Sequence, residues 1–247
     1  MGFNKKRVLI TGGSSGIGAA TAIRLAHEGA MVFISYRKNE HGAQNVLNRV
    51  STGGGVAFSV RCDLADPASI ESMLAQTEAE LGGIDILINN AGNYIAGDEW
   101  NGLPEVWART LQENLVGTMC VSKKVAEMFI KQQSGVIVSI ASRLGVLGNY
   151  EELAYGASKA GVINITQAYA RLLAPFGRAN SISPVAVKTG YWATAPQEEL
   201  EKLLTDNPLD RLVEVDEVVE SIVFLASDNS RMITGQNIVL GAGYMRK

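Results

Sequence analysis

Seven short apolar runs, separated by longer segments of helical periodicity, are the feature of this 247-residue sequence that most constrains its fold. The runs are rich in Val, Ile and Leu and cover residues 7–11, 31–35, 56–60, 84–89, 135–140, 180–183 and 237–240. Strands of nearly continuous apolar character are buried on both faces, as in a parallel sheet. The sequence therefore predicts an α/β fold with a doubly wound parallel sheet of about seven strands and helices on both faces.

The segments between these runs have the apolar spacing of helices that pack against a sheet. Between residues 19 and 26, apolar side chains recur at i, i+3, i+4 and i+7, and Gly29 is placed to end that helix. Further helices are expected at 40–51, 67–81, 103–131, 153–174 and 215–227.

No repeat or linker divides the chain, so residues 1–247 are expected to form a single dinucleotide-binding and catalytic domain. The segment 190–211 breaks the alternation with Pro196, Pro208 and a short amphipathic piece around 198–204. It follows the carboxyl end of an expected strand, where an open sheet builds its substrate site. We therefore expect a substrate lid at about 190–211.

Composition and charge exclude several classes of function. A net charge of −3 argues against nucleic acid as a partner, because such proteins carry a basic field. No apolar run approaches the roughly 20 residues that span a bilayer. Cys62 and Cys120 match no disulfide or metal spacing, which favours a cytoplasmic location, and His27 and His41 lack the partners of a metal site.

A glycine-rich turn, Thr11-Gly-Gly-Ser-Ser-Gly-Ile-Gly18, joins the first expected strand to the first helix. Its glycines permit a tight turn, and the helix N-terminus beyond it presents backbone amides to an anion. The spacing matches neither the common G-x-G-x-x-G motif nor the G-x-x-x-x-G-K-[ST] motif of nucleotide triphosphatases. We interpret the turn as a phosphate-binding site for a dinucleotide.

Tyr155 and Lys159 lie four residues apart on an expected helix and therefore share one face. Ser142 follows the apolar run 135–140, which places its hydroxyl at the carboxyl end of a central strand. A phenol is a poor acid or base at neutral pH, but a neighbouring cation favours its ionised form and lowers its pKa. Such a pair also occurs by chance, as an aromatic ring packed along a lysine stem, so the remaining motifs carry the interpretation.

Taken together, these motifs resemble those of the short-chain dehydrogenase/reductase family, and the resemblance runs from Arg7 to about Tyr244. The nucleotide signature is Thr11-Gly-x-x-x-Gly16-x-Gly18, and the run Asn89-Asn90-Ala91-Gly92 follows the fourth strand. The catalytic tetrad of the family corresponds to Asn114, Ser142, Tyr155 and Lys159. Within the family, the chain is most similar to reductases of the 3-oxoacyl-carrier-protein reductase type, with a Rossmann-type fold.

The resemblance implies a role for each tetrad residue. Ser142 and the Tyr155 phenol would hydrogen-bond the substrate oxygen, and Tyr155 would give it a proton as general acid. Lys159 would hold the cofactor ribose and, together with the positive charge of the oxidised nicotinamide, lower the pKa of the phenol. Asn114 would anchor a water that continues the proton path. The activity implied is reduction of a ketone or 3-oxoacyl group to a secondary alcohol, with an NAD-dependent alcohol dehydrogenase as the alternative.

The cofactor is expected to be NADP(H), with NAD(H) possible. The end of the second strand reads Ser35-Tyr36-Arg37-Lys38, without the carboxylate that would bind a ribose 2′-hydroxyl, and Arg37 can contact a 2′-phosphate. The expected cofactor-binding residues are Gly12, Ser14, Ser15, Gly16, Ile17, Gly18, Arg37, Asp63, Leu64, Asn90, Ala91, Gly92, Tyr155, Lys159, Pro184, Val187 and Thr189. The chain departs from the family pattern at Val185, usually glycine, and at 240–243, where the family has an acidic-Gly-Gly ending.

The substrate is expected to be a small-molecule carbonyl or alcohol with apolar flanks. The candidate pocket residues are Tyr94, Leu144, Tyr150, Tyr191 and Trp192, with Ile95 and Val146 beside them. The two positions at which relatives of this type dock an acidic carrier protein are Gln133 and Phe176, neither of them basic, which argues against a carrier-bound substrate.

The sequence argues against two other functions. An enoyl reductase is disfavoured because its tyrosine position is Glu152 here, and a non-catalytic nucleotide-sensing regulator is disfavoured because the tetrad is intact. The resemblance also implies a homotetramer or homodimer, formed through the helices at 103–131 and 153–174 and through the last strand.

Overall fold

The computed structural model describes residues 2–205, 207–241 and 243, and the side chains of Tyr191 and Lys202 lie outside this description. The strands are β1 (Arg7–Ile10), β2 (Met31–Tyr36), β3 (Val56–Arg61), β4 (Ile86–Asn89), β5 (Gly135–Ile140), β6 (Gly177–Pro184) and β7 (Asn237–Leu240). They form one seven-stranded sheet in the order β3-β2-β1-β4-β5-β6-β7, and every neighbouring pair is parallel. The predicted doubly wound parallel sheet is confirmed.

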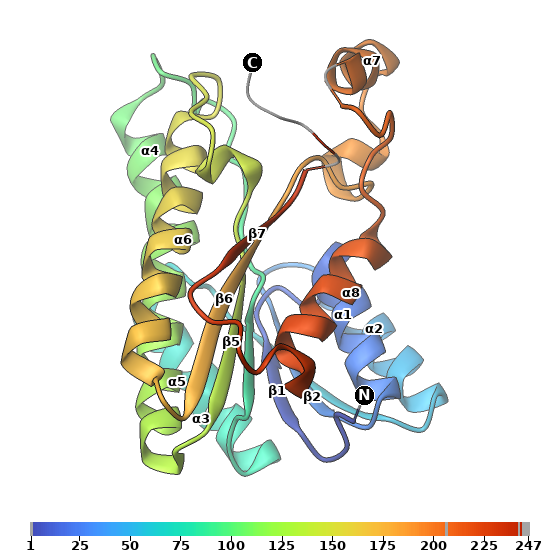
Figure 1. Cartoon of the computed structure of the whole chain (residues 1–247), viewed down its shortest axis with the longest axis vertical. Coiled ribbons are helices and arrows are strands. Elements are labelled where there is room, and N and C mark those ends of the chain that lie inside the picture. The colour runs from blue at the N-terminus through green and yellow to red at the C-terminus, as the bar shows by residue number, and fades with distance from the viewer. Residues whose placement is uncertain (1, 206, 242, 244–247) are drawn as a thin grey trace.

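Helices cover both faces of this sheet. They are α1 (Gly16–His27), α2 (Glu40–Thr52), α3 (Pro67–Leu81), α4 (Pro104–Leu111), α5 (Gly117–Gln132), α6 (Leu153–Leu173), α7 (Gln197–Thr205) and α8 (Val215–Ala226). Figure 1 shows α3, α4, α5 and α6 on one side of the sheet and α1, α2 and α8 on the other. Four short helical turns, η1 (Gln112–Val116), η2 (Arg143–Gly145), η3 (Gly190–Ala193) and η4 (Asp228–Ser230), complete the order of elements.

The core consists of two apolar clusters, one on each face of the sheet. Along β1, Val8 and Ile10 point into the cluster beneath α1, α2 and α8, whereas Leu9 points into the cluster beneath α3, α5 and α6. The same alternation recurs along β4, because successive side chains of a strand point to opposite faces. Strands that are apolar at every position therefore contribute side chains to both clusters, as the sequence pattern indicated.

Local signals explain why several helices begin and end where the sequence predicts. The side chain of Asn39 accepts a hydrogen bond from the Gly42 N–H at 3.0 Å and caps α2. At α3, Asp66 caps the N-terminus, Pro67 occupies the first turn, and Gly82 ends the helix with a left-handed φ of 73°. The bounds of α3 coincide with the predicted 67–81.

The expected helix at 103–131 is not a continuous α-helix. It consists of α4 and α5 joined by η1, a single π-helical turn over Gln112–Val116. A π-turn inserts one residue into the helical ladder and is frequent at functional sites. Apolar periodicity does not reveal such an insertion, because the flanking turns keep their own period.

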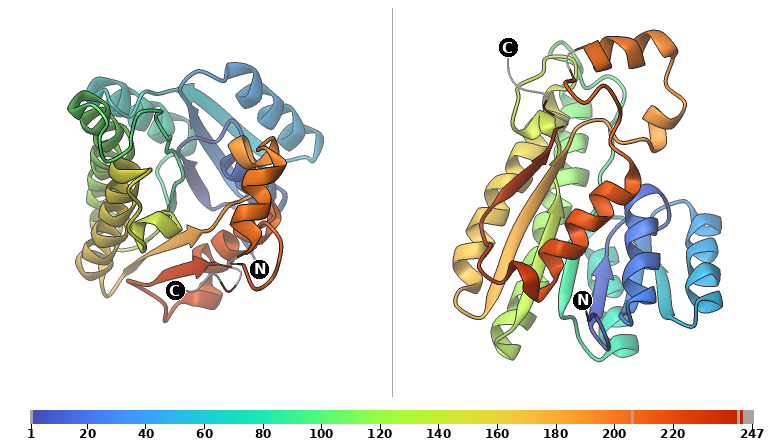
Figure 2. Two further views of the ribbon diagram at one scale, coloured as in Figure 1. Left: turned by 90° about the horizontal axis from the view of Figure 1, so that it is seen from above. Right: turned by 45° about the vertical axis from the view of Figure 1, so that its right-hand side comes forward.

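The region 190–211 contains η3 and α7, and it stands above the carboxyl ends of the strands (Figure 2). Before it, residues 186–188 pair with Val213: the Val213 N–H donates to Ala186 O and the Lys188 N–H to Val213 O. The chain therefore leaves the sheet after β6, forms α7, and returns to the same place before α8. Among the described residues, no helix is long and apolar enough to cross a membrane.

Candidate active site

A cavity of about 1280 Å³ lies at the carboxyl ends of β1, β4, β5 and β6. The sheet order reverses between β1 and β4, and this switch point is where doubly wound sheets bind their ligands. One end of the cavity is lined by the glycine turn and by residues after β2 and β3. The other end is lined by Ser142, Tyr155, Lys159 and residues of the loops after β4 and β6.

The glycine turn is held in place by Asn90, which follows β4. The Asn90 side-chain amide donates to Thr11 O at 3.0 Å and to Gly12 O at 2.9 Å. Gly16 opens α1 with a φ of +52°, and a Cβ atom at this position would lie 2.8 Å from Thr189 Oγ1. The turn therefore needs glycine for its backbone angles and for its close approach to the segment after β6.

Tyr155 and Lys159 project into the cavity from the first turns of α6. The Lys159 ammonium lies 5.7 Å from the centroid of the Tyr155 ring, and Nζ donates a hydrogen bond to Ile140 O at 2.8 Å. Burial lowers the pKa of Lys159 to about 8. A Cβ atom at Gly92 would lie 2.8 Å from Nζ, so the glycine in this position leaves the space that the ammonium needs.

The Tyr155 phenol is held in its protonated form. Its pKa is raised to about 12, mainly by burial and also by the negative charge of Glu152, while a hydrogen bond with Ser142 acts in the opposite direction. Loss of hydration is the largest of these effects, and the ammonium of Lys159 is directed at Ile140 O. The lowering of the phenol pKa by Lys159 together with the positive charge of an oxidised nicotinamide stays a prediction.

Asn114 lies within the π-turn η1 and is 1% exposed. Its side-chain amide donates to Asn93 O at 2.7 Å, and its side-chain oxygen accepts from the Asn93 N–H at 2.8 Å. This two-way pairing fixes the backbone that follows Ala91 and Gly92. Asn114 thus connects the π-turn to the loop after β4, on the side of the cavity where Lys159 lies.

Asp98 holds the N-terminus of the helix that carries Tyr155, a role with no signal in the sequence pattern. Its side chain is fully buried, and Oδ2 accepts the backbone N–H of Tyr155 at 2.7 Å. Its carbonyl oxygen accepts the N–H of Leu153 at 3.0 Å. Glu152, at the cap position of α6, makes no side-chain capping bond, so Asp98 supplies the cap from a distant loop. Burial raises the pKa of Asp98.

At the other end of the cavity, Arg37 forms an ion pair with Glu113. Arg37 Nη1 lies 2.6 Å from Glu113 Oε2, and both residues line the cavity. Asp63 and Leu64 line the same end, and the Asp63 side chain accepts the N–H of Ala65 at 3.0 Å. Glu113 was not anticipated from the sequence. Its spacing of four from Arg109 indicates a helical ion pair, but nothing in the pattern indicates Arg37 as a partner.

Most of the residues expected at the site meet in this one cavity. Those that line it are Gly12, Ser14, Ser15, Gly16, Ile17, Arg37, Asp63, Leu64, Asn90, Ala91, Gly92, Tyr94, Asn114, Ser142, Leu144, Tyr155, Lys159, Pro184, Val187, Thr189 and Trp192. Gly18 is not among the lining residues. It packs against the inside of the turn, where a Cβ atom would lie 2.4 Å from Gly12 O. Tyr150 is not among the lining residues either, and it is 66% exposed.

Ile95 and Val146 are likewise absent from the lining, and the Tyr191 side chain lies outside the described part of the structure. The family departure at Val185 has a structural explanation: its side chain is buried in the core, and its N–H donates to Leu240 O at 3.0 Å. Residues 240–243 also depart from the family pattern, and of these Ala242 lies outside the described residues.

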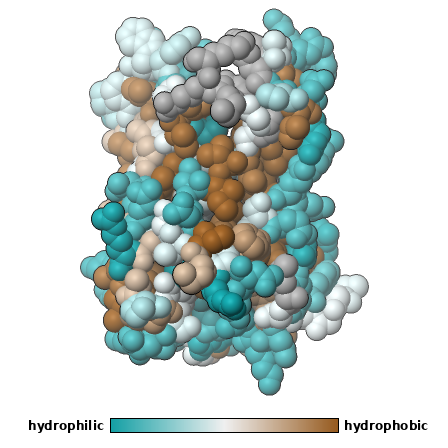
Figure 3. Space-filling view, viewed as in Figure 1, coloured by the Kyte–Doolittle hydropathy of each residue, from teal (hydrophilic) through white to brown (hydrophobic). Residues whose placement is uncertain are grey.

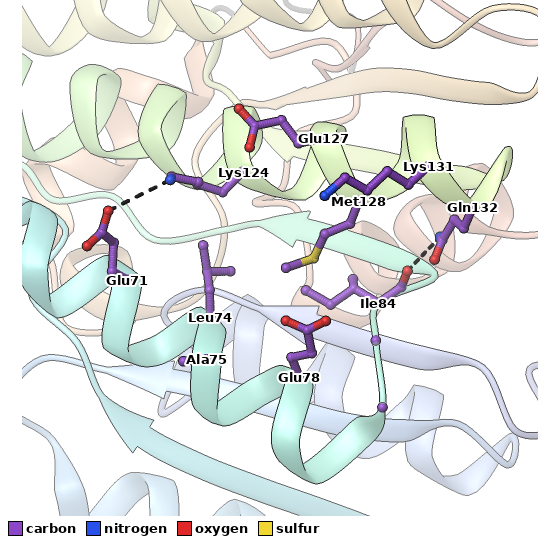
Figure 4. Close-up of a pocket in the computed structure, with 12 residues that line it drawn as sticks. Glu71, Leu74, Ala75, Glu78, Ile84, Lys124, Glu127, Met128, Lys131 and Gln132 are labelled. Carbon is purple, nitrogen blue, oxygen red and sulfur yellow. Dashed lines mark hydrogen bonds and ion pairs between the residues drawn. The ribbon is translucent and has the colours of Figure 1, made fainter.

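A second hollow, of about 580 Å³, lies between α3 and α5 (Figure 4). Lys124 of α5 faces Glu71 of α3 there, with 3.8 Å between Nζ and Oε1, and the Gln132 side chain donates to Ile84 O at 2.8 Å. None of the residues expected at the site lines it. Of these two cavities in the described part of the chain, the larger one is lined by the residues expected at the site and the smaller one is not.

Comparisons with known proteins identify the family to which this fold belongs. A family model described as "Enoyl-(Acyl carrier protein) reductase", a short-chain dehydrogenase/reductase model, matches residues 12–245. The chain is 31% identical over 239 residues to the 3-oxoacyl-[acyl-carrier-protein] reductase FabG of Staphylococcus aureus, covering 96% of this chain and 97% of that protein.

Two solved structures have the same fold over nearly the whole chain. NAD⁺-bound xylitol dehydrogenase superposes with a TM-score of 0.91 at 31% identity, covering 98% of this chain and 99% of the other. The NADPH-dependent 3-quinuclidinone reductase of Rhodotorula rubra superposes with a TM-score of 0.91 at 28% identity, covering 98% and 92%.

The doubly wound sheet, the cavity at its switch point and these matches together define an oxidoreductase. With a match over nearly its full length, the chain belongs to the short-chain dehydrogenase/reductase family. Its relatives are named both as reductases and as dehydrogenases.

Proposed function

We propose that this protein is an NADPH-dependent reductase that converts a ketone to a secondary alcohol, with Tyr155 as the general acid. The observation that carries the proposal is the convergence of Ser142, Tyr155 and Lys159 at one end of a cavity whose other end is the glycine turn. A phenol with a pKa of about 12 is protonated at neutral pH, which is the form that an acid needs.

The residues present fit a nicotinamide dinucleotide. Gly12, Ser14 and Gly16 form a turn at the N-terminus of α1, where backbone amides favour a pyrophosphate. The absence of a side chain at Gly92 leaves the Lys159 ammonium facing the cavity, where it would hold a ribose hydroxyl. When bound, the cofactor supplies the hydride.

The residues of this chain supply the proton and the positioning. Ser142 and Tyr155 hydrogen-bond the carbonyl oxygen, and Tyr155 transfers its proton to that oxygen as negative charge develops there. Lys159, whose pKa of about 8 leaves it mostly charged at neutral pH, stabilises the phenolate that remains. Asn114 fixes the loop after β4 through Asn93, which keeps this side of the cavity rigid.

The preference for NADP(H) rests on the end of β2. Arg37 and Lys38 line the cavity there, and no carboxylate follows β2 before Glu40. An NAD-dependent alcohol dehydrogenase on the same scaffold is the second candidate, favoured by the likeness to NAD⁺-bound xylitol dehydrogenase.

The substrate is proposed to be a small ketone with apolar flanks. Tyr94, Leu144 and Trp192 line the cavity, and Glu199 of α7 lines it as well. Residues 190–211 are therefore proposed as the lid of the substrate end. Gln133 and Phe176, at the positions used for docking a carrier protein, offer no positive charge to an acidic partner.

A homotetramer, or a homodimer, is proposed for the assembly. Four apolar residues expose 38–53% of their surface: Val116 of η1, Met119 of α5, and Leu153 and Leu172 of α6. Along the face that carries β7, apolar residues gather over the middle of the molecule (Figure 3), and Val239 of that edge strand is 48% exposed. The free thiols of Cys62 and Cys120 favour a cytoplasmic location.

One experiment tests the proposed activity. A panel of small ketones, β-keto thioesters and sugars is assayed for oxidation of NADPH and of NADH, with the matching alcohols assayed in the reverse direction. We expect turnover of ketones with NADPH at a higher kcat/KM than with NADH. Turnover confined to alcohols with NAD⁺ would establish the second candidate, and binding of neither cofactor would refute both.

A further inference from the structure

Arg37 and Glu113 form a bridge between two walls of the cofactor end of the cavity. Arg37 follows β2, whereas Glu113 lies in η1, 76 residues later in the chain and next to Asn114. The Nη1–Oε2 distance is 2.6 Å, and the two side chains are 30% and 8% exposed. The arginine expected to contact a 2′-phosphate is thus already paired with a buried carboxylate.

The two contacts of Glu113 differ in kind. Arg109, one helical turn earlier, donates a hydrogen bond from Nε to Oε1 at 2.9 Å. Among the described residues, Oε2 accepts no well-directed hydrogen bond, so the contact with Arg37 is an ion pair without a directed N–H···O bond. Arg37 is therefore the partner that another anion can draw away, while Arg109 keeps its hydrogen bond.

We propose that Glu113 is a specificity-determining residue that limits the preference for NADP(H) over NAD(H) by competing with the 2′-phosphate for Arg37. The inference rests on the proposed function, because it takes the cavity to bind a nicotinamide dinucleotide with Arg37 at its adenosine end.

Two physical effects act against NADP(H) and leave NAD(H) unaffected. If Arg37 turns to the phosphate, Glu113 loses one of its two cations while it stays buried, and a buried charge without full compensation is costly. The carboxylate also repels the phosphate directly. NAD(H) carries a 2′-hydroxyl in this place, so it leaves the ion pair intact and meets neither effect.

Two variants test the proposal in opposite directions. Glu113→Gln keeps the size of the side chain and removes the charge, so Arg37 is released and the Kd for NADPH should fall roughly tenfold, with the Kd for NADH changed by less than about twofold. Arg109→Gln removes the hydrogen-bonded partner of Glu113, which binds Glu113 more strongly to Arg37. The Kd for NADPH should then rise, again with little change for NADH.

The measurement is the Kd of each cofactor for the purified protein, from titration of NAD(P)H fluorescence at fixed ionic strength. Glu127→Gln is the matched control, because it removes one exposed carboxylate outside this cavity. It should leave the ratio of the two dissociation constants as in the parent protein, and thermal unfolding of each variant confirms the native fold.

The outcomes separate this inference from the proposed function. An unchanged NADPH-to-NADH ratio in Glu113→Gln, or an equal change for both cofactors, would overturn the role of Glu113 while leaving the reductase assignment in place. A shift of the same sign in Arg109→Gln and Glu113→Gln would also overturn it. Failure of the parent protein to bind either cofactor would refute the proposed function itself.

Discussion

The buried ammonium of Lys159 should make the stability of this protein depend on pH in a way that one substitution removes. Its ordinary pKa of 10.5 falls to about 8 in the folded chain because of burial. Below pH 8 both folded and unfolded chains carry the proton, and the folded chain bears the full penalty of a buried charge. Between pH 8 and 10.5 the unfolded chain binds more protons, so stability rises with pH.

The size of the effect follows from the two pKa values. Each pH unit in that window adds at most about 1.4 kcal/mol to the free energy of unfolding, and the whole window adds about 3 kcal/mol. Lys159→Met removes the titrating group and with it this gain. At pH 7 the loss of the buried charge should make the variant more stable than the parent. About 1–3 kcal/mol is subtracted from this gain in the free energy of unfolding, because the Ile140 carbonyl loses its hydrogen-bond donor.

The assay is urea unfolding followed by circular dichroism at pH 7, 8, 9 and 10.5. The free-energy advantage of Lys159→Met over the parent should shrink by about 3 kcal/mol across this range. Tyr155 is present in both the parent and the variant, so its titration contributes equally to both stabilities and cancels in their difference. Lys123→Met, which removes an exposed lysine of α5, is the control. A difference between variant and parent that stays constant with pH would refute the buried ammonium.

Two further substitutions test the positioning of the site. Gly92→Ala places a Cβ atom 2.8 Å from Lys159 Nζ, so the ammonium must move, and kcat should fall by roughly 10²-fold in a steady-state assay; an unchanged kcat would contradict the close approach. Asp98→Ala leaves the Tyr155 N–H without its buried acceptor and should lower the free energy of unfolding by about 1–2 kcal/mol in urea titrations. Asp98→Asn keeps an acceptor oxygen and should recover part of that loss, whereas equal losses in the two variants would argue against a capping role.

The sheet was predictable because its strands carry their own signal. Five of the seven apolar runs start where the structure starts a strand, and β5 and β7 coincide with their predicted bounds. The prediction placed the start of β6 too late, at Asn180 instead of Gly177, because Arg178 interrupts the apolar run. Its guanidinium donates to Ile233 O and Ser227 O, so the charge is accommodated by carbonyl groups that are distant in sequence.

The candidate site was predictable where its chemistry depends on fixed spacing. The glycine turn and the Tyr155–Lys159 pair are local patterns, and the fold brings them to one cavity. Asp98 and Glu113 were not predictable, because each acts through a partner more than 50 residues away. A single acidic residue in a loop or a helix is by default a solvated one, and only the tertiary structure shows that these two are buried.

The central claim is that Tyr155 supplies the proton while other residues hold the cofactor, and Tyr155→Phe tests it most directly. NADPH turnover with the best ketone of the panel and the Kd for NADPH are measured on the parent, on Tyr155→Phe and on Tyr169→Phe, a control on the same helix whose hydroxyl lies outside the cavity. We predict that Tyr155→Phe loses turnover by at least about 10²-fold and retains its Kd, while Tyr169→Phe keeps both. Turnover undiminished in Tyr155→Phe would contradict the account.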